Sequence, residues 1–364
     1  MGLTCGIVGL PNVGKSTLFS AISSNKAEAA NYPFCTIEPN VGVVTVPDER
    51  LDVLADLVKP QRILPTVIEF TDIAGLVKGA SQGEGLGNKF LANIREVSAI
   101  IHVIRCFEDE NVLREEGVID PISDKEIIET ELQLKDIESV EKKIQRAEKM
   151  AKTDPKAKVE LEVLHKCKNH LEQGRSIRSL QLSKEEKVAI ADIFLLTEKP
   201  VMYVANVEEA SMHKGNKYSD ALVSMAKAEG AEVIVMCNNI ESQIAELEDA
   251  ADRAIFMEEY KMKEPALNRL IQSAYKLLNL ETYFTVGVQE VRAWTIGKGW
   301  KAPQAASVIH TDFEKGFIKA EVISFDDFIK YKSEVACREN GRLRIEGKEY
   351  IVKDGDVMHF RFNV

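Results

Sequence analysis

The 364-residue sequence has no apolar run that approaches the roughly 18 residues needed to span a membrane. It also has no excess of positive charge, because 58 acidic residues outnumber 47 basic ones and give a formal net charge of −11. A global positive field that would draw the whole chain onto nucleic acid is therefore excluded, and any RNA contact has to come from a local patch. We expect neither a membrane nor DNA among the partners.

Cysteine is scarce and scattered. The six cysteines include no C-x-x-C pair, which favours reduced thiols in a cytoplasmic protein. Hydrophobic residues make up 45% of the chain and charged residues 29%, which is ordinary for a soluble globular protein. The length suggests two or three domains. We expect a cytoplasmic monomer.

What the sequence does contain is a phosphate-binding motif near its start. Residues 9–17 read G-L-P-N-V-G-K-S-T, the pattern G-x-x-x-x-G-K-[ST] of P-loop nucleotide hydrolases. The two glycines would let the backbone N–H groups face the phosphates, Lys15 would meet the β- and γ-phosphates, and the Ser16 hydroxyl would bind Mg²⁺. A β-rich run at 6–8 precedes the motif and a helix-forming run at 18–22 follows it, so the phosphates would lie at a helix N-terminus.

Six residues of this motif are predicted to contact the nucleotide: Asn12, Val13, Gly14, Lys15, Ser16 and Thr17.

Two further segments have the patterns of nucleotide switches. Residues 31–40 contain two prolines and two asparagines and read as a loop, in which the only threonine, Thr36, is the candidate Mg²⁺ ligand that senses the γ-phosphate. Asp72 follows a predicted strand at 66–71 and begins the pattern D-x-x-G with Gly75. Asp72 would hold Mg²⁺ through water, and the Gly75 N–H would contact the γ-phosphate and move when it leaves.

The residue after Gly75 is Leu76, at the place where Ras-like enzymes carry the glutamine that orients the attacking water. Leucine cannot hydrogen-bond water, so this chain lacks that group. Gln82 in the following glycine-rich stretch is an alternative water-positioning residue, although an exposed loop glutamine commonly has no such role. His102 lies within a predicted buried strand at 99–107 and reads as a core histidine.

A third strand, at 200–205, ends in N-V-E-E at the place of the guanine-specific pattern N-K-x-D. Asn206, Val207 and Glu209 are the predicted base contacts. Glutamate is one methylene longer than aspartate and would disturb the two-point contact with guanine, while valine removes the lysine stem that lies along the base. The change predicts adenine or relaxed specificity, because a lost polar match in a binding site lowers discrimination by kilocalories.

The middle of the chain predicts two helices. Apolar residues recur at helical spacing from Leu134 to Ala151, and a second apolar stripe runs from Leu161 to Leu171 after a break at 152–155. We interpret this pattern as an antiparallel helical pair that projects from the nucleotide domain, with two helices packed on the core as the alternative.

After a further predicted helix at 256–280, short alternating strands indicate a small, separate α+β domain. The predicted boundaries are 1–124 and 196–280 for the nucleotide-binding domain, 125–195 for the helical insertion and 281–364 for the C-terminal domain.

Taken together, the motifs resemble those of the YchF/Obg-like ATPase family over essentially the whole chain. The resemblance rests on G-L-P-N-V-G-K-S-T at 9–17, N-Y-P-F-C-T-I-E-P-N at 31–40, D-I-A-G-L-V-K-G-A at 72–80, N-V-E-E at 206–209, H-T-D-F at 310–313 and G-F-I-K-A-E-V-I at 316–323.

The resemblance implies an α/β P-loop NTPase domain with a helical coiled-coil insertion, followed by a β-grasp (TGS) domain. It implies ATP preferred over GTP, and ribosome binding through the TGS domain and the insertion. A hydrophobic residue in place of the catalytic glutamine is a property of the family, which agrees with Leu76. In related potassium-activated switches an asparagine at the place of Asn12 seats K⁺, which would supply a fixed positive charge. Bacterial relatives often carry a histidine shortly after the place of Asn111, and this chain has Val112-Leu113-Arg114 there, which leaves the activation of water open.

The predicted function is a slow Mg²⁺-dependent ATPase that hydrolyses ATP to ADP as a conformational switch and binds GTP weakly. Lys15, Asn12, Asp72 and Gly75 are the predicted catalytic residues, Ser16 and Thr36 the predicted metal ligands, and K⁺ a further candidate cofactor. A GTPase of the same architecture and a non-hydrolysing, ATP-controlled scaffold remain as alternatives.

Overall fold

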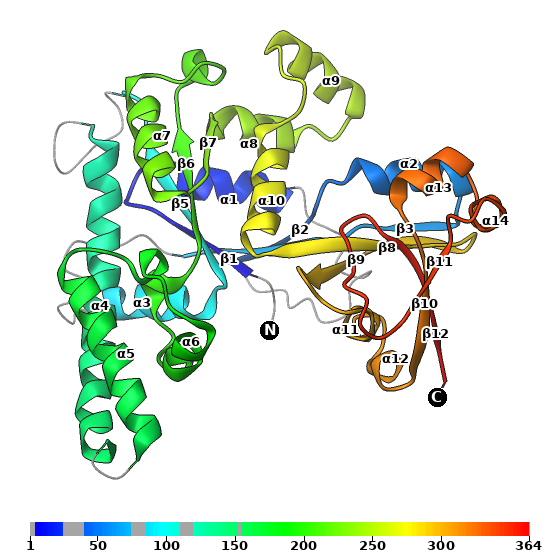
Figure 1. Cartoon of the computed structure of the whole chain (residues 1–364). Helices are drawn as coiled ribbons and strands as arrows, with labels where there is room; N and C mark the ends of the chain where they lie inside the picture. The colour runs from blue at the N-terminus through cyan, green and yellow to red at the C-terminus, as the bar shows by residue number, and fades with distance from the viewer. Residues whose placement is uncertain (1–3, 25–39, 74–84, 110–118, 152–153, 364) are drawn as a thin grey trace. The chain divides into compact units, whose positions relative to one another are not determined.

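The computed structural model describes residues 4–24, 40–73, 85–109, 119–151 and 154–363 (Figure 1). The chain divides into two compact units. The first comprises residues 1–25, 37–42 and 69–270, and the second comprises residues 26–36, 43–68 and 271–364. In the part of the chain that the structure describes, no helix has both the length and the apolar composition needed to cross a membrane.

The nucleotide-binding unit is organised around a six-stranded sheet of order β2-β4-β1-β5-β6-β7. Its strands are β1 (Thr4–Val8), β2 (Val41–Thr45), β4 (Val67–Asp72), β5 (Ala99–Arg105), β6 (Val201–Asn206) and β7 (Val233–Met236). β4, β1, β5, β6 and β7 pair in parallel. Every residue of β5 and β6 is buried, which explains why both strands read as continuous apolar runs rather than as alternating ones.

Around this sheet lie α1 (Lys15–Ser24), α3 (Gly85–Glu96), α7 (Lys217–Glu229) and α8 (Asn238–Glu246). The next helix, α9 (Ala250–Glu259), has no buried residue and packs on α8, and α10 (Ala266–Leu277) follows it. One core packs Ile94 of α3 and Leu222 of α7 against Ile100 and Ile104 of β5. His102 of the same strand is buried beside the Tyr203 ring, and burial lowers its pKa to about 3, so it is a neutral core histidine as predicted.

The prediction of one helix over residues 256–280 is wrong. The chain forms α9 and α10 with a break between them, and Leu280 already belongs to a strand. Lys261 adopts a positive φ of 52°, which ends the first helix, and Pro265 precedes the second. The buried Glu241 carboxylate accepts the Ala266 and Leu267 N–H groups at 2.9 and 3.1 Å, so a side chain from α8 caps the new helix.

The predicted antiparallel pair is confirmed as α4 (Pro121–Met150) and α5 (Pro155–Glu172), which we call the helical hairpin (Figure 1). Aspartates cap both helices, with proline at the first helical position. Ile144 and Ala147 of α4 pack against Leu164 and Cys167 of α5. The first turns of α4 instead contribute Leu132 to the core on the sheet, so the hairpin is anchored at its base and self-packed beyond it.

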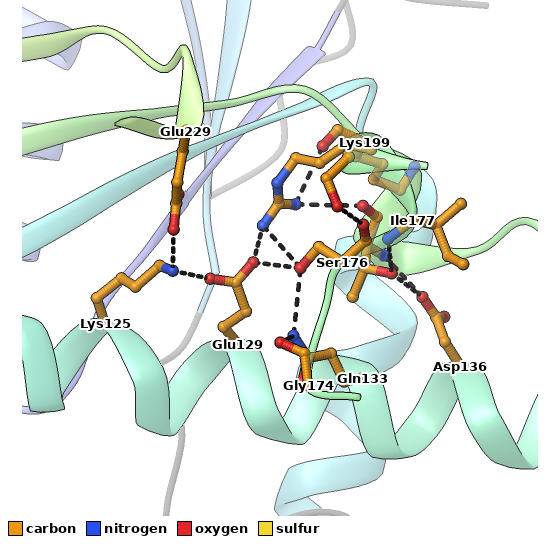
Figure 2. A network of polar contacts seen from close by, with 12 residues as sticks. Lys125, Glu129, Gln133, Asp136, Gly174, Ser176, Ile177, Lys199 and Glu229 are labelled. Atoms are coloured by element: carbon orange, nitrogen blue, oxygen red, sulfur yellow. Dashed lines mark hydrogen bonds and ion pairs between the residues drawn. The ribbon is translucent and has the colours of Figure 1, made fainter. Parts of the chain in front are cut away.

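A polar network fixes the base of the hairpin (Figure 2). Lys125 pairs with Glu129 one turn later and, at 2.6 Å, with Glu229 of α7. Glu129 also accepts hydrogen bonds from Arg178 and Ser176, which follow α5. Lys125 and Glu129 are largely shielded from water, so removing one partner of this network would leave an uncompensated charge at the start of α4.

Asp136 extends this network and is fully buried. Its carboxylate accepts the backbone N–H groups of Leu196 and Thr197 at 2.8 Å each and the Thr197 hydroxyl at 2.7 Å. Leu196 and Thr197 belong to the turn (Leu196–Glu198) that leads into β6. One side chain therefore joins α4 to the strand that ends at Asn206.

The second unit contains another six-stranded sheet, of order β11-β10-β12-β8-β9-β3. Its strands are β3 (Arg62–Leu64), β8 (Leu280–Val286), β9 (Glu290–Gly297), β10 (Phe317–Ile323), β11 (Arg344–Glu346) and β12 (Val357–Phe362). β8 and β9 form a hairpin, β10 pairs antiparallel with β11 and β12, and β12 runs parallel to β8. Its helices are α2 (Glu49–Val58), α11 (Ala302–Ser307), α12 (Thr311–Lys315), α13 (Phe325–Tyr331) and α14 (Glu334–Glu339), and the expected small α+β domain is present.

The segment between β2 and β4, which carries α2 and β3, belongs to this second unit, although the sequence predicts it within the nucleotide-binding domain. The reason is long-range pairing: β3 runs parallel to β9, and Leu54 of α2 packs on Phe284 and Phe328. Arg50 also forms an ion pair with Asp354 at 2.7 Å. The ends of β2 and β4 at 43–45 and 67–68 fall in the same contact group but pair in the first sheet. The other predicted boundaries stay predictions.

We predict that Asp136→Asn lowers the free energy of unfolding by about 1–3 kcal/mol, because an amide NH₂ would replace an acceptor that faces three donors. Urea unfolding followed by circular dichroism measures the change. Glu148→Gln, at an exposed position of the same helix, is the control and should be neutral. A neutral Asp136→Asn variant would contradict the assigned role.

Candidate nucleotide-binding site

The loop between β1 and α1 has the backbone shape that phosphate binding requires. Asn12 and Gly14 take positive φ angles of 61° and 90°, and the helix begins at Lys15. The loop lies at the carboxyl end of a parallel strand, where ligands of α/β proteins bind. A Cβ on Gly14 would lie 2.3 Å from Asn206 Nδ2, and one on Gly9 would lie 2.7 Å from the Val103 carbonyl oxygen. Both glycines of the motif are therefore required by close packing, and Gly14 by its φ as well.

Two buried asparagines support the loop through hydrogen bonds to its carbonyl groups. Asn206, at the end of β6, donates its Nδ2 to the Val13 carbonyl at 3.0 Å. Asn238, after β7, donates its Nδ2 to the Gly14 carbonyl at 3.0 Å, and its backbone N–H donates to Asn206 Oδ1 at 3.0 Å. We call this arrangement the asparagine clamp. With the loop carbonyls bound to the clamp, the loop N–H groups are left to face a ligand.

The sequence predicts Asn206 as a base contact, and the structure shows it supporting the phosphate loop. The sequence does not predict that Asn238 supports the loop, although Asn238 directly follows the apolar run that contains β7. Parallel strands end at one edge of the sheet, and that rule is the signal that could have linked Asn238 to the loop.

Lys15 and Asp72 lie together at this edge. Their Nζ and Oδ1 atoms are 2.8 Å apart, and the two side chains are 11% and 20% exposed. Asp72 ends β4, which pairs with β1 directly beside the loop. The structure thus brings the predicted phosphate-binding cation and the predicted Mg²⁺ partner into contact, across 57 residues of sequence.

The donor set fits Mg²⁺. The Ser16 side chain is exposed on the first turn of α1. The Asp72 carboxylate contacts Lys15, the residue before Ser16, and so offers a second oxygen at this end of the helix. Mg²⁺ is commonly held by one or two protein oxygens together with substrate phosphates and water. The described residues include no group of three His, Cys, Asp or Glu side chains suited to hold a metal.

A cavity of about 720 Å³ opens above the loop, within the size range of small-molecule and cofactor sites. Its lining includes predicted site residues: Asn12, Gly14, Lys15, Ser16, Thr17, Asn206, Val207 and Glu209. Val13 is buried and packs inward. Val207 is also only 2% exposed, so most of its side chain lies in the core.

One wall of this cavity is formed by Phe107, Glu108 and Asp109, which the sequence does not single out. Arg105, buried at the end of β5, donates to the Phe107 and Asp109 carbonyls at 3.1 and 3.2 Å. Its guanidinium also lies 4.7 Å from the centre of the Phe107 ring. An arginine at the end of a buried strand is the sequence signal for this wall, because a buried charge needs such partners.

Five residues that the sequence singles out lie outside the described residues: Thr36, Gly75, Leu76, Gln82 and Asn111. Their proposed roles stay predictions.

Comparisons with known proteins agree with this geometry. A family model described as 50S ribosome-binding GTPase (MMR_HSR1) matches residues 4–145, and the model YchF-GTPase_C, described as a protein of unknown function, matches residues 280–363. The "Ribosome-binding ATPase YchF" of Haemophilus ducreyi is 59% identical over 365 residues, with 100% of both chains covered. The chain belongs to the YchF family. The Bacillus subtilis protein of the same description is 53% identical over 367 residues, again with full coverage of both.

Solved structures confirm the predicted fold class of this YchF-family chain, a P-loop domain with helices followed by a C-terminal domain. The Schizosaccharomyces pombe YchF GTPase superposes with a TM-score of 0.89 at 41% identity and covers 99% of this chain and 98% of its own. A GTP-binding protein from Pyrococcus horikoshii shares the fold, with a TM-score of 0.63 at 20% identity over the full length of both chains.

We predict that Gly14→Ala weakens ATP binding at least about tenfold, because the added methyl group would force the loop away from Asn206 and overpacking costs about 1–3 kcal/mol. Isothermal titration calorimetry measures the affinity. Gly230→Ala is the matched control: it also has a positive φ, of 71°, but has nothing within 4 Å of the new Cβ. It should lose some stability and keep its ATP affinity; equal ATP affinities for the two variants would contradict the role of the clamp.

Proposed function

We propose that this chain is a ribosome-binding ATPase that hydrolyses ATP to ADP and acts as a conformational switch. The observation that carries the enzymatic part is the contact between Lys15 and Asp72 beside the left-handed turn at Gly14, at the base of the cavity. The ribosome part rests on the relatives described as ribosome-binding ATPases.

In this proposal Lys15 exchanges part of its interaction with Asp72 for the β- and γ-phosphates. The hydroxyls of Ser16 and Thr36, with Asp72 through water, would hold Mg²⁺, and the bound ion would supply positive charge beside the phosphate oxygens. Water attacks the γ-phosphorus in line with the bond to ADP, which breaks as the new P–O bond forms. The protein contributes position and charge, with the N–H of Gly75 and the loop amides facing the transferred group.

Asn12 is the proposed place for K⁺, because it lines the cavity at the turn of the loop. A fixed cation there would add positive charge near the phosphates without a partner protein. The activation of the attacking water stays unassigned to a side chain, since Leu76 cannot serve.

ATP is the proposed nucleotide. In N-K-x-D proteins the aliphatic part of the lysine side chain lies along the base. Val207 stands at that place here, and its side chain lies mostly in the core. Glu208 and Glu209 both line the cavity, and Glu208 also accepts hydrogen bonds from Asn216 and Ser211. A glutamate side chain is one methylene longer than the aspartate that contacts guanine in N-K-x-D. Its carboxylate therefore does not reproduce the two-point contact with guanine, and the loss of that contact favours adenine.

A GTPase of the same architecture is the second candidate, because the relative from Schizosaccharomyces pombe is described as a GTPase. Binding of ATP and GTP to the purified chain, compared by calorimetry, separates the two. Tighter binding of ATP is expected, and a clear preference for GTP would reject the proposed role of Val207 and Glu209.

We predict that Lys15→Ala reduces ATP hydrolysis by about two orders of magnitude or more, because preorganised charge at the phosphates commonly contributes that much. Phosphate release at steady state, in K⁺ and in Na⁺, measures the effect. Lys227→Ala, at an exposed position of α7, is the control and should be as active as the unmodified chain. Hydrolysis that survives the change would contradict the role assigned to Lys15. A Lys15→Ala variant that keeps full cellular function would favour the scaffold alternative.

The ribosome contact is proposed to involve the C-terminal domain and the helical hairpin, in a cytoplasmic, monomeric protein. Co-sedimentation with purified ribosomes at low salt, in the presence of ADP or a non-hydrolysable ATP analogue, tests it. A chain that stays in the supernatant in both states would overturn this part and leave the enzymatic part standing.

A further inference from the structure

Charge is separated along the helical hairpin. Residues 121–141 of α4 hold seven acidic and two basic side chains. Around the turn between the helices, residues 142–151 and 154–158 hold six basic and two acidic ones. A chain with a net charge of −11 thus carries a local excess of positive charge at the end of its longest helix. At 1.5 Å per residue, the 30 residues of α4 place that end about 45 Å from its first turn.

The basic side chains of the hairpin fall into two classes. Five lysines are paired with carboxylates: Lys125 with Glu129 and Glu229, Lys135 with Glu138, Lys143 with Glu160 and Asp192, Lys166 with Glu186, and Lys168 with Glu141 and Glu172. The other five, which we call the tip cations, are exposed: Lys142, Arg146, Lys149, Lys156 and Lys158. Within the described ranges, none of the tip cations forms an ion pair with a carboxylate.

Three tip cations share one face of α4. Lys142, Arg146 and Lys149 are spaced by four and three residues, which stacks them on one side of a helix. Ile144 and Ala147 lie on the opposite, buried side and pack against α5. The cationic face is therefore fully presented to solvent.

Helix stability does not account for this arrangement. Like charges spaced by four residues destabilise a helix by about 0.2–0.5 kcal/mol. The helix dipole favours cations only in the last turn, where Lys149 lies, and disfavours them in a first turn such as that of α5, where Lys156 and Lys158 lie. The dipole favours Lys149, but the spacing of the α4 cations and the first-turn positions of the α5 cations are unfavourable. A cluster that is kept in this way, with no carboxylate partner among the described residues, has the properties of a surface that binds an external anion.

We propose that the tip cations bind the phosphate backbone of RNA. Closely spaced, unpaired cations on a helix face match a polyanion, whereas an acidic protein surface offers fewer charges per unit length. Residues 142–158 contain no aromatic side chain on which a base could stack. We therefore expect the contact to be made to phosphate groups, without a preference for any base sequence. For its biological setting, this proposal rests on the proposed ribosome binding. It assigns to the end of the hairpin a direct contact with ribosomal RNA.

The test replaces Lys142, Arg146 and Lys149 together by glutamine in the full chain. Binding to a short, fluorescein-labelled RNA duplex is measured by anisotropy over a range of KCl concentrations. Affinity at low salt should fall at least about tenfold, and the slope of log K against log salt should become shallower by about 2–3, given about 0.9 per phosphate contact in a duplex. ATP hydrolysis, helicity and thermal unfolding should not change, because these side chains touch neither the core nor the cavity.

The matched control removes the same charge elsewhere, by changing Lys214, Lys227 and Lys263, all exposed, to glutamine. It should bind the duplex within about twofold of the unmodified chain, because a net-charge effect is weak compared with direct phosphate contacts. A second variant, Lys156→Gln with Lys158→Gln, tests the α5 side of the tip independently and should weaken binding as well.

Equal affinity and equal salt slope for the tip variant and the unmodified chain would overturn the proposal. So would a tip variant that no longer sediments with ribosomes yet binds the RNA duplex normally, since that result would assign the tip to an acidic protein surface. A chain that binds the duplex through its tip but does not sediment with ribosomes would support the tip assignment and overturn the proposed ribosome binding instead.

Discussion

The hydrogen bonds from Asn206 and Asn238 to the carbonyls of the phosphate loop are the contacts on which the site depends. A loop that turns its N–H groups toward phosphates must turn carbonyls toward the protein, and a buried carbonyl without a donor costs about 1–3 kcal/mol. The asparagine clamp supplies a donor to the Val13 carbonyl and a second donor to the Gly14 carbonyl, which also accepts the Leu18 N–H at 3.1 Å. Because the clamp comes from the ends of β6 and β7, the loop has its shape only when the parallel sheet has formed.

The same sheet connects the site to the helical hairpin. Asp136 of α4 binds the turn that leads into β6, and β6 ends at Asn206. Lys125 and Glu129 anchor the first turns of α4 next to α7 (Figure 2). The base of the hairpin is thus held by buried polar contacts on the elements that support the phosphate loop. At its far end the tip cations are exposed, and among the described residues none of them pairs with a carboxylate.

Where the sequence misled, the cause was a contact between distant residues. Helical spacing of apolar residues predicted one helix at 256–280, but the chain turns at Lys261 and restarts after Pro265, where Glu241 supplies the cap. The segment between β2 and β4 lies inside the range 1–124 that the sequence predicts as nucleotide-binding, yet its contacts group it with the second unit. Its assignment to the second unit depends on β9 and on Phe284, more than 200 residues later.

By itself, the sequence determined the phosphate loop, the Asp72 pattern, the broken guanine motif and the two hairpin helices. These are local features, in which φ preferences, spacing and caps act over a few residues. Only the tertiary structure decided that Lys15 and Asp72 touch, that Asn206 and Asn238 support the loop, and which hairpin lysines are paired. Such contacts join residues that are far apart in the chain, and their geometry exists only after the strands have paired and the core has packed.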